Sequence, residues 1–280
     1  MGEIIRFFST FFLFLIALTS CELPVKVPGN EHDNIWDENN PNYKNYGMEI
    51  ISGPENDTII DTNQVTFRWH GTGLAQSDEN KIYKYRWDEG SWIATKDTVL
   101  TRRWLEEKSY QFEVYAFSEV DTARKSSIQS REFTVDAIPK NSLYVYPRFI
   151  KIDRGRSDTI QIRAEDVDPV MGVELDLVHD TSSINILSIT EGDFFRQNAD
   201  DVIFIAETSR DTVQVIVVRT GKTSPTVSGD GVIAELHIEG KRASSSEISL
   251  TGNSKFYDQN GDPAETRERV GGIIKVNLSL

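Results

Sequence analysis

Runs in which hydrophobic and polar residues alternate recur between residues 47 and 136. Every second side chain is apolar in Val65–Trp69, in Tyr83–Trp87 and in Tyr110–Ala116. Because alternate side chains of a β-strand lie on the same face, each run predicts a strand with one buried face. Turn-forming residues separate the runs, as at Gly53-Pro54 and Asp88-Glu89-Gly90. Several short strands at this spacing predict a β-sandwich over residues 47–136.

The alternation resumes at residue 142 and continues to the end of the chain. No stretch there keeps the period of an amphipathic helix, and about nine to eleven short strands predict a jelly-roll type of sandwich over residues 142–280. A short connection, Asp136–Ser142, separates the two regions. The sequence therefore predicts an all-β chain of two tandem β-sandwiches with limited hinge freedom between them.

The aromatic residues of the first region carry a family resemblance. Trp69 in VTFRW, the run YKYRW, and the strand that begins at Tyr110, preceded by Leu105, resemble a fibronectin type III domain. The resemblance implies that Trp69 fills the core and that Tyr110 forms a tyrosine corner. The usual Pro-Gly turn before the Tyr is replaced here by Glu106–Ser109 (EEKS). An immunoglobulin-like variant of the sandwich is the alternative.

Four landmarks in the second region, in chain order, resemble a cohesin domain. They are Gly172–Leu177 (GVELDL), Leu187–Phe195 (LSITEGDFF), Ser228–Ile238 (SGDGVIAELHI) and Tyr257–Asp262 (YDQNGD), and the third is the most specific. The sequence departs from the family's Tyr-Asp-Pro at Val178-His179-Asp180. The resemblance implies a cohesin-like fold, an architecture shared with some carbohydrate-binding modules. It also implies that one sandwich face docks a helical protein partner, which for cohesins is a dockerin.

The first 20 residues have the pattern of an export signal. Arg6 precedes an apolar run, Phe7–Leu18, that is too short to span about 30 Å of hydrocarbon comfortably. The sequence Leu18-Thr19-Ser20-Cys21 resembles the lipobox of bacterial lipoproteins, which implies cleavage before Cys21 and lipidation of its thiol. Two or three acyl chains hold a protein in a membrane essentially permanently. Glu22, where Asp would favour inner-membrane retention, favours the outer membrane or cell surface.

Residues 21–46 are rich in Pro, Asn and Asp and predict a polar linker between the lipid and the folded part. The formal net charge of the chain is −14, which opposes binding to nucleic acid and electrostatic adhesion to anionic lipid. Cys21 is the single cysteine, so an intramolecular disulfide and a Cys-based zinc site are excluded.

The sequence offers few candidates for chemistry. Its four histidines are widely spaced, and it has neither a nucleophile elbow nor a phosphate-binding loop, which predicts a chain that is not an enzyme. Asp258, Asn260 and Asp262 resemble the first half of a calcium loop, but the bidentate acid that would complete the loop is missing. No cofactor is required on this interpretation, and calcium is an option only at that turn. The acidic bend Glu165–Pro169 predicts a loop rather than a metal site.

Four tryptophans of the first region have two alternative roles, packing in the core or stacking on a sugar ring. Trp69 and Trp87 alternate with charged residues, which predicts core positions, whereas Trp92 and Trp104 fit no clean alternation and are the candidates for stacking on sugar. Three hypotheses for function follow. The chain is a non-catalytic surface lipoprotein that binds a dockerin-type protein in polysaccharide degradation, a lipoprotein that binds polysaccharide directly, or a structural component of the cell envelope.

Overall fold

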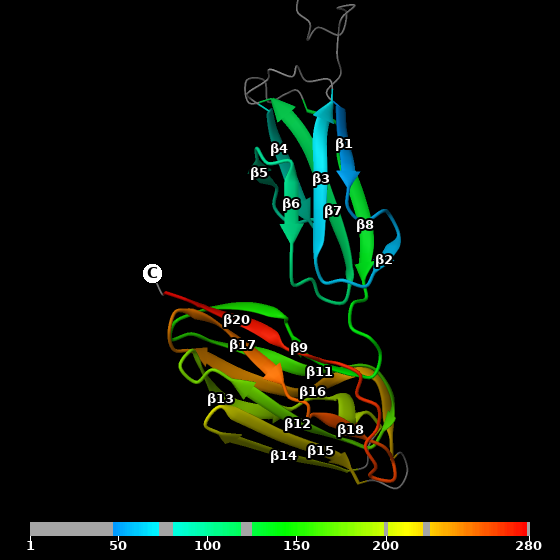
Figure 1. The fold of residues 1–280 in the computed structure, drawn as a ribbon, viewed down its shortest axis with the longest axis vertical. Coiled ribbons are helices and arrows are strands. Elements are labelled where there is room, and N and C mark those ends of the chain that lie inside the picture. Colours follow the sequence, from blue (N-terminus) through cyan, green and yellow to red (C-terminus); the bar gives the residue numbers. More distant parts are fainter. Residues whose placement is uncertain (1–46, 73–80, 119–124, 199–200, 221–224, 279–280) are drawn as a thin grey trace, which may run out of the picture.

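The structure is a computed structural model that describes residues 47–72, 81–118, 125–198, 201–220 and 225–278. These residues form two β-sandwiches, one after the other, joined by a short connection (Figure 1). The predicted fold class, an all-β chain of two tandem sandwiches, is confirmed. The expected signal peptide, the lipidated Cys21 and the linker 21–46 lie outside the described residues. Within the described residues, no helix has the length and hydrophobicity needed to cross a membrane.

The first module consists of two sheets packed face to face. One has the strand order β1-β3-β6, and the other has the order β2-β8-β7-β4-β5. Strands β1 and β3 are antiparallel, whereas β2 runs parallel to β8. The strands are β1 (Gly47–Ser52), β2 (Thr58–Ile60), β3 (Val65–Thr72), β4 (Lys81–Trp87), β5 (Ile93–Thr95), β6 (Val99–Arg102), β7 (Ser109–Ser118) and β8 (Gln129–Val135).

Aromatic side chains from both sheets fill the core of the first module. The alternating residues of β7, Tyr110, Phe112, Val114 and Ala116, are all buried, as their pattern predicts. The ring of Phe67 on β3 stacks on that of Phe112 with centroids 4.1 Å apart. Stacked and edge-to-face aromatic pairs stabilise a core beyond the area they bury. The core therefore joins β3 of one sheet to β7 of the other.

Tyr110 also ties the loop before β7 to the module. The backbone amide of Glu106 donates a hydrogen bond of 2.8 Å to the Tyr110 hydroxyl, which is the arrangement of a tyrosine corner. Burial is the main cause that raises the pKa of Tyr110, so the hydroxyl stays neutral. The corner forms although Glu106–Ser109 replace the Pro-Gly turn that the resemblance to fibronectin type III domains would imply.

The second module is a larger sandwich of two sheets. One sheet has the order β10-β20-β17-β12-β15-β14, with β18 paired to β12, and the other has the order β13-β16-β11-β9-β19. The elements are β9 (Ser142–Tyr146), β10 (Phe149–Asp153), β11 (Ser157–Val170), β12 (Gly172–His179), β13 (Ile184–Glu191), the 3-10 turn η1 (Phe194–Arg196), β14 (Val202–Ser209), β15 (Thr212–Arg219), β16 (Val227–Gly240), β17 (Ser244–Leu250), β18 (Lys255–Tyr257), β19 (Arg269–Val270) and β20 (Gly272–Asn277).

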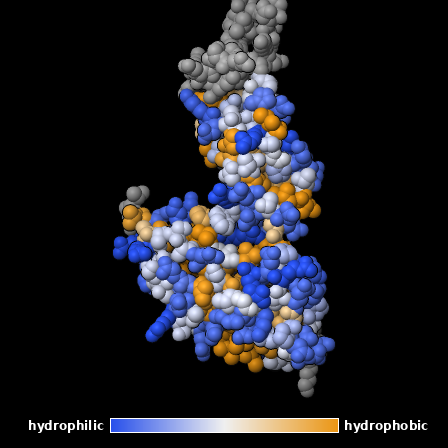
Figure 2. Space-filling model, viewed as in Figure 1, coloured by the Kyte–Doolittle hydropathy of each residue, from blue (hydrophilic) through white to orange (hydrophobic). Residues whose placement is uncertain are grey.

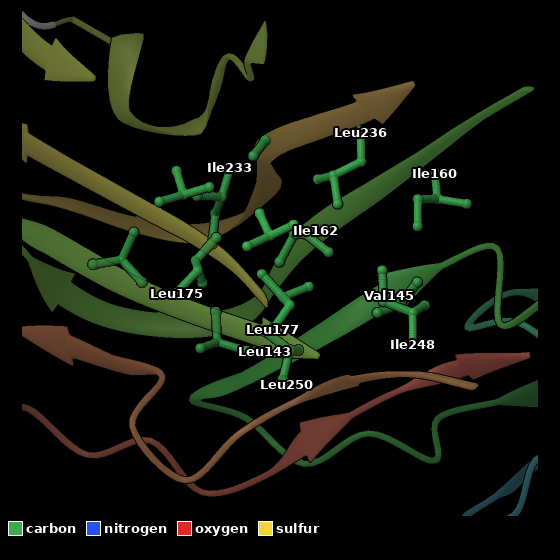
Figure 3. Packing of buried hydrophobic residues seen from close by; sticks show 14 of the residues in the cluster. Leu143, Val145, Ile160, Ile162, Leu175, Leu177, Ile233, Leu236, Ile248 and Leu250 are labelled. Carbon is green, nitrogen blue, oxygen red and sulfur yellow. The ribbon is translucent and has the colours of Figure 1, made fainter. Parts of the chain in front are cut away.

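Branched aliphatic side chains from the two sheets meet in the core of the second module (Figure 3). Leu175 and Leu177 of β12 face Ile162 of β11 and Ile233 of β16, and each of these side chains is almost completely buried. Burying a Val, Leu or Ile side chain stabilises a fold by roughly 1.5–3 kcal/mol relative to exposure. The aliphatic core accounts for the Val- and Ile-rich runs of this half of the sequence.

Two of the four cohesin-like landmarks pack directly against each other. The amide of Gly192 donates to the carbonyl of Ile233 at 2.9 Å, and η1 buries Phe194 beside Gly231. A Cβ atom at Gly192 would lie 2.1 Å from the Val232 carbonyl oxygen. Glycine is therefore required by close backbone approach where LSITEGDFF meets SGDGVIAELHI.

The prediction that the acidic bend Glu165–Pro169 is a loop was wrong. These residues belong to β11, which runs from Ser157 to Val170 beside β16. The register of this pair shifts between Ala164 and Val167 and again before Val170. Such bulges let a strand continue through residues that regular pairing disfavours, Pro169 among them.

A compact network of contacts joins the two modules. Glu107 accepts hydrogen bonds from the amides of Ala137 (2.7 Å) and Ile138 (3.3 Å), and its other oxygen binds Arg148 Nη2 at 2.7 Å. The amide of Arg148 donates to Glu106 Oε1 at 2.8 Å. The side chains of Arg148 and Glu107 are only 3% and 12% exposed. Residues that depart from the fibronectin pattern thus hold the second module in place.

Candidate docking surface

The outer face of the β14-β15-β12-β18 sheet carries apolar side chains in register. Cross-strand pairing aligns Ile205 on β14 with Ile216 on β15 and Glu174 on β12. The neighbouring row aligns Ile203, Val218, Gly172 and Tyr257 across the same four strands. Ile203, Ile205 and Ile216 are 49%, 49% and 41% exposed. We call the side chains of Ile203, Ile205, Ile216, Val218 and Tyr257 the apolar patch.

A hollow of about 310 Å³ lies within this face, between β15, β12 and β18. Its walls are mostly apolar, and its lining residues are Met171, Gly172, Val173, Glu174, Ile216, Val218, Tyr257 and Gly261. The Tyr257 hydroxyl donates a hydrogen bond of 2.8 Å to Glu174 Oε2, which fixes the ring at the edge of the hollow. The hollow has room for a protruding apolar side chain of a partner.

Acidic residues lie beside the apolar patch. The next cross-strand row consists of Glu207, Gln214 and Asp176. Asp176 Oδ2 accepts hydrogen bonds from Thr251 Oγ1 (2.8 Å) and Asn253 Nδ2 (3.0 Å), so its carboxylate is held at the border. An apolar centre with a polar, charged rim is the usual anatomy of a protein interface.

The apolar patch lies on the side of the molecule away from the first module. Strands β14 and β15 form the edge of the second module that is farthest from the first (Figure 1). Hydrophobic colouring is concentrated at this end of the second module in the space-filling view (Figure 2). A partner that binds there meets no obstruction from the first module.

The pattern of β14 and β15 contained a signal for this surface. Strict alternation gives way to the consecutive apolar runs Val202–Ile205 and Val213–Val218 except at Gln214. A strand that is apolar on both faces is typically covered on both. Here one face lies against the core and the other is exposed. These two runs are the sequence signal of a docking face whose residues the predictions above leave unknown.

The structure places the two candidate sugar-stacking tryptophans differently. Arg86 lies over the ring of Trp92 at 4.6 Å, and the ring of Tyr115 meets it edge-on at 4.8 Å. Trp104 is 42% exposed and adopts a positive φ of 60°. Only Trp104 therefore presents an open ring, and the structure does not bring the two tryptophans into one site. Trp69 is buried and Trp87 packs against the core, as predicted.

The candidate calcium turn uses its carboxylate internally. Asp258 Oδ1 accepts hydrogen bonds from the amides of Asn260 (2.8 Å) and Asp262 (3.0 Å). These bonds lower the pKa of Asp258. In the described ranges, no group of three or more His, Cys, Asp or Glu side chains is arranged to hold a metal ion. Calcium binding at Asp258, Asn260 and Asp262 stays a prediction.

Of the residues that depart from the cohesin pattern, Val178 and His179 end strand β12, and Asp180 opens the tight turn that follows it. Asp180 accepts hydrogen bonds from the Ser182 amide at 2.8 Å and from the Ser183 hydroxyl. These bonds, led by that of Ser183, lower the pKa of Asp180 to about 2. His179 is buried, and burial lowers the pKa of its imidazole. This segment therefore organises the end of the strand.

A scan of protein-family models finds no match to this chain, and a search of curated proteins finds no relative. Solved structures similar to about half of the chain include several cohesins. A non-cellulosomal cohesin from Archaeoglobus fulgidus is 16% identical over 50% of this chain and 92% of its own, with a TM-score of 0.41. A type II cohesin from Acetivibrio cellulolyticus is 15% identical over 49% and 95%, with a TM-score of 0.43.

A type I cohesin–dockerin complex from Clostridium thermocellum is similar at 19% identity over 51% of this chain and 99% of the matched chain, with a TM-score of 0.40. Identities and scores at this level do not carry a functional assignment.

Proposed function

We propose that this chain is a non-catalytic, lipid-anchored surface protein whose second module binds a dockerin-type protein partner. The observation that carries the proposal is the apolar patch, two cross-strand rows of exposed side chains on one face of the β14-β15-β12-β18 sheet. A contiguous exposed apolar surface with a polar rim is the mark of a protein interaction site. The cohesin-like landmarks of the sequence also support the binding of a dockerin-type partner by the second module.

The dimensions of the patch suit a helical partner. Four strands spaced about 4.8 Å apart present a face roughly 14 Å wide. An α-helix with its side chains is about 10–12 Å across, so one amphipathic helix covers both apolar rows. Aliphatic residues on that helix would pack on Ile205 and Ile216, with one of them in the hollow beside Tyr257.

The charge distribution favours a different protein over a second copy of this chain. Glu174, Asp176 and Glu207 border the patch, and the whole chain carries a net charge of −14. Two copies joined through this face would bring like charges together, which disfavours association. The partner is expected to carry Lys or Arg beside its apolar residues.

The first module and the N-terminus complete the proposal. The sheet orders β1-β3-β6 and β8-β7-β4-β5, with the corner at Tyr110, support a fibronectin type III-like spacer. The sequence Leu18–Cys21 supports lipidation at Cys21 and a place at the outer membrane or cell surface. In this arrangement the lipid and residues 21–46 form the base, and the docking face lies at the far end, where it holds a partner that bears a polysaccharide-degrading enzyme.

Binding titrations against calcium-loaded dockerin domains test the docking proposal. Ile216→Asp places a charge in the centre of the apolar patch and should weaken binding by about 100-fold, equivalent to about 3 kcal/mol. Ile59→Asp is the matched control, because Ile59 is 71% exposed and belongs to the first module. Binding that survives Ile216→Asp unchanged, or a panel of dockerins of which none binds, would refute the proposal.

A separate experiment tests the anchor. Cys21→Ser removes the thiol that would receive the lipid, so the protein should leave the membrane fraction and change its mobility on a gel. The control is Ser20→Ala, which keeps the thiol and a small residue before it. A Cys21→Ser protein that stays in the membrane fraction with unaltered mobility would show that no lipid is attached there.

A further inference from the structure

A cleft of about 510 Å³ lies between the two modules, on the side of the first module where β6 ends. The first module contributes Arg102, Arg103, Trp104, Glu106, Lys108 and Tyr110, and the second contributes Tyr146, Phe149 and Lys151. Figure 2 shows a notch with hydrophilic side chains where the two modules meet. The volume lies in the range of about 300–1,000 Å³ that is typical of small-molecule sites.

The charge of the cleft is opposite to that of the chain. Four cations, Arg102, Arg103, Lys108 and Lys151, line it together with a single carboxylate, Glu106. Lys108 pairs with Asp88 at 3.2 Å, but among the described residues no carboxylate lies within salt-bridge distance of Arg102, Arg103 or Lys151. In a protein of net charge −14, a concentration of unneutralised cations focuses a positive potential that attracts an anion.

Aromatic rings form the other part of the lining. Trp104 stands at the cleft with 42% of its surface exposed and a positive φ of 60°, which is an uncommon backbone conformation for a bulky residue. The next residue, Leu105, is buried, and its amide donates to the Asn63 carbonyl at 2.9 Å. This anchoring holds the indole outward. Strained conformations of this kind are concentrated at functional sites.

The walls of the cleft are held in place. Arg102 lies over the rings of Trp87 (4.5 Å) and Tyr110 (5.6 Å), so its guanidinium has a fixed position. The buried pair of Arg148 and Glu107 joins the two walls behind the cleft. A preorganised site loses less conformational entropy when it binds a ligand than a flexible one.

We propose that this cleft binds an acidic saccharide. A sugar ring offers an apolar face that stacks on the Trp104 indole, and its carboxylate or sulfate group pairs with Arg103 and Lys151. An inorganic anion has no face to stack on the exposed indole of Trp104. A neutral sugar has no charge to pair with the cations of the cleft. Nucleic acid would need a far larger basic surface than this acidic chain presents. The site is independent of the docking face, which lies at the opposite end of the second module.

Calorimetric titration of the protein, with residues 21–280 intact, tests the proposal with three probes. They are an oligogalacturonate, a neutral galacto-oligosaccharide of the same length and a sulfated galacto-oligosaccharide. At least one acidic probe should bind about tenfold or more tightly than the neutral probe. Its affinity should fall as salt is added, because charge pairing at an open cleft is screened. The preferred acidic probe identifies the source of the negative charge.

Three variants locate the binding. The pair Arg103→Glu and Lys151→Glu, combined, should abolish the preference for acidic sugar, and Trp104→Ala should lower affinity about tenfold. Trp104→Phe keeps an aromatic face and should recover part of that loss. Arg210→Glu, an exposed charge reversal in the turn between β14 and β15, is the matched control and should bind as the unaltered protein does.

Two results would overturn the proposal. One is equal affinity for acidic and neutral probes, or no binding of any acidic probe at about 1 mM. The other is an acidic preference that persists in the Arg103→Glu, Lys151→Glu double variant while circular dichroism shows a native fold. Dockerin binding should be unaffected by these variants, so failure here and failure of the docking proposal are distinguishable.

Discussion

Two kinds of residue stabilise the first module and its junction with the second: buried aromatic residues on the strands and the carboxylates of the turn before β7. Alternation placed Phe112 and Trp69 in the core because a strand exposes only one face. Glu106 and Glu107 gave no such signal, since adjacent carboxylates in a turn normally face solvent. Their role depends on Arg148, about 40 residues further along the chain, and the sequence pattern of a single strand carries no information about such a partner.

The tyrosine corner makes a prediction for the stability of the first module. Tyr110→Phe leaves the Glu106 amide without its acceptor, so the free energy of unfolding should fall by about 1–2 kcal/mol. Four of the five tryptophans lie in the first module and none lies in the second, so the tryptophan fluorescence of a urea titration reports mainly on the first module. Tyr115→Phe, half-buried on the same strand, is the control. Equal losses in both variants would mean that the corner contributes nothing specific.

Glu165 makes the stability of the protein depend on pH. Burial, with the nearby charges of Asp230, Glu107 and Asp136, raises the pKa of Glu165 from 4.5 to about 7. Between pH 4.5 and about 7, the folded state therefore holds a proton that the unfolded state releases. The stability associated with the protonated Glu165 carboxyl is fully present below pH 4.5 and is lost as the pH rises through about 7. At pH 8, ionised Glu165 destabilises the fold by about 1 kcal/mol after allowance for its partial exposure to solvent.

Glu165→Gln should therefore melt a few degrees higher than the unaltered protein at pH 8, by about 3 °C. The difference should vanish below pH 4.5, where Glu165 is protonated. Thermal melts at several pH values measure this, with exposed Glu247→Gln as the control. A stability difference that does not change with pH would contradict the assignment.

At the scale of elements, long strands were predictable and short ones were not. The runs at Val173–Leu177 and Val213–Val218 became β12 and β15, because several alternations suffice to define a face. Strands β18 and β19 span three residues and two residues, too few for any period to register. The bulged end of β11 was not predicted as a strand, because acidic residues and Pro169 are typical of loops. The docking face was missed because exposed apolar residues resemble core residues in sequence.

The close approach of the Gly192 backbone to β16 predicts that Gly192 cannot be replaced without loss of stability. Gly192→Ala forces a Cβ to within 2.1 Å of the Val232 carbonyl oxygen, so strand β13 or β16 must shift. Overpacking of this kind costs typically about 1–3 kcal/mol of folding free energy. Gly252→Ala is the control, because nothing lies within 4 Å of its Cβ position. Calorimetric melting should show a lower temperature for Gly192→Ala alone.

For the molecule as a whole, the sequence predicted two tandem sandwiches but not the contacts that join them. The break in alternation at Asp136–Ser142 marked the boundary, because a linker lacks a buried face. The Glu107–Arg148 pair and the amides bound by Glu107 join the two modules, and we expect these contacts to limit hinge motion between them. That junction also forms the cleft proposed for acidic sugar.

Arg148→Ala tests the rigidity of the junction. It leaves Glu107 buried without its cation, and breaking a buried pair from one side costs about 3–5 kcal/mol. The modules should then unfold in two separate transitions, and small-angle scattering should show a broader range of shapes. Lys140→Ala removes an exposed pair with Asp168 and should change neither measurement. Unchanged scattering for Arg148→Ala would show that other contacts hold the modules.

Isoleucine methyl NMR shows whether a dockerin-type partner binds the apolar patch or the opposite sheet of the second module. Labelled protein is titrated with a calcium-loaded dockerin that binds it. We expect the methyl signals of Ile203, Ile205 and Ile216 to shift, while those of Ile186 and Ile189 on β13, in the opposite sheet, stay in place. Shifts confined to β13, with the three methyl groups of the patch unperturbed, would contradict it.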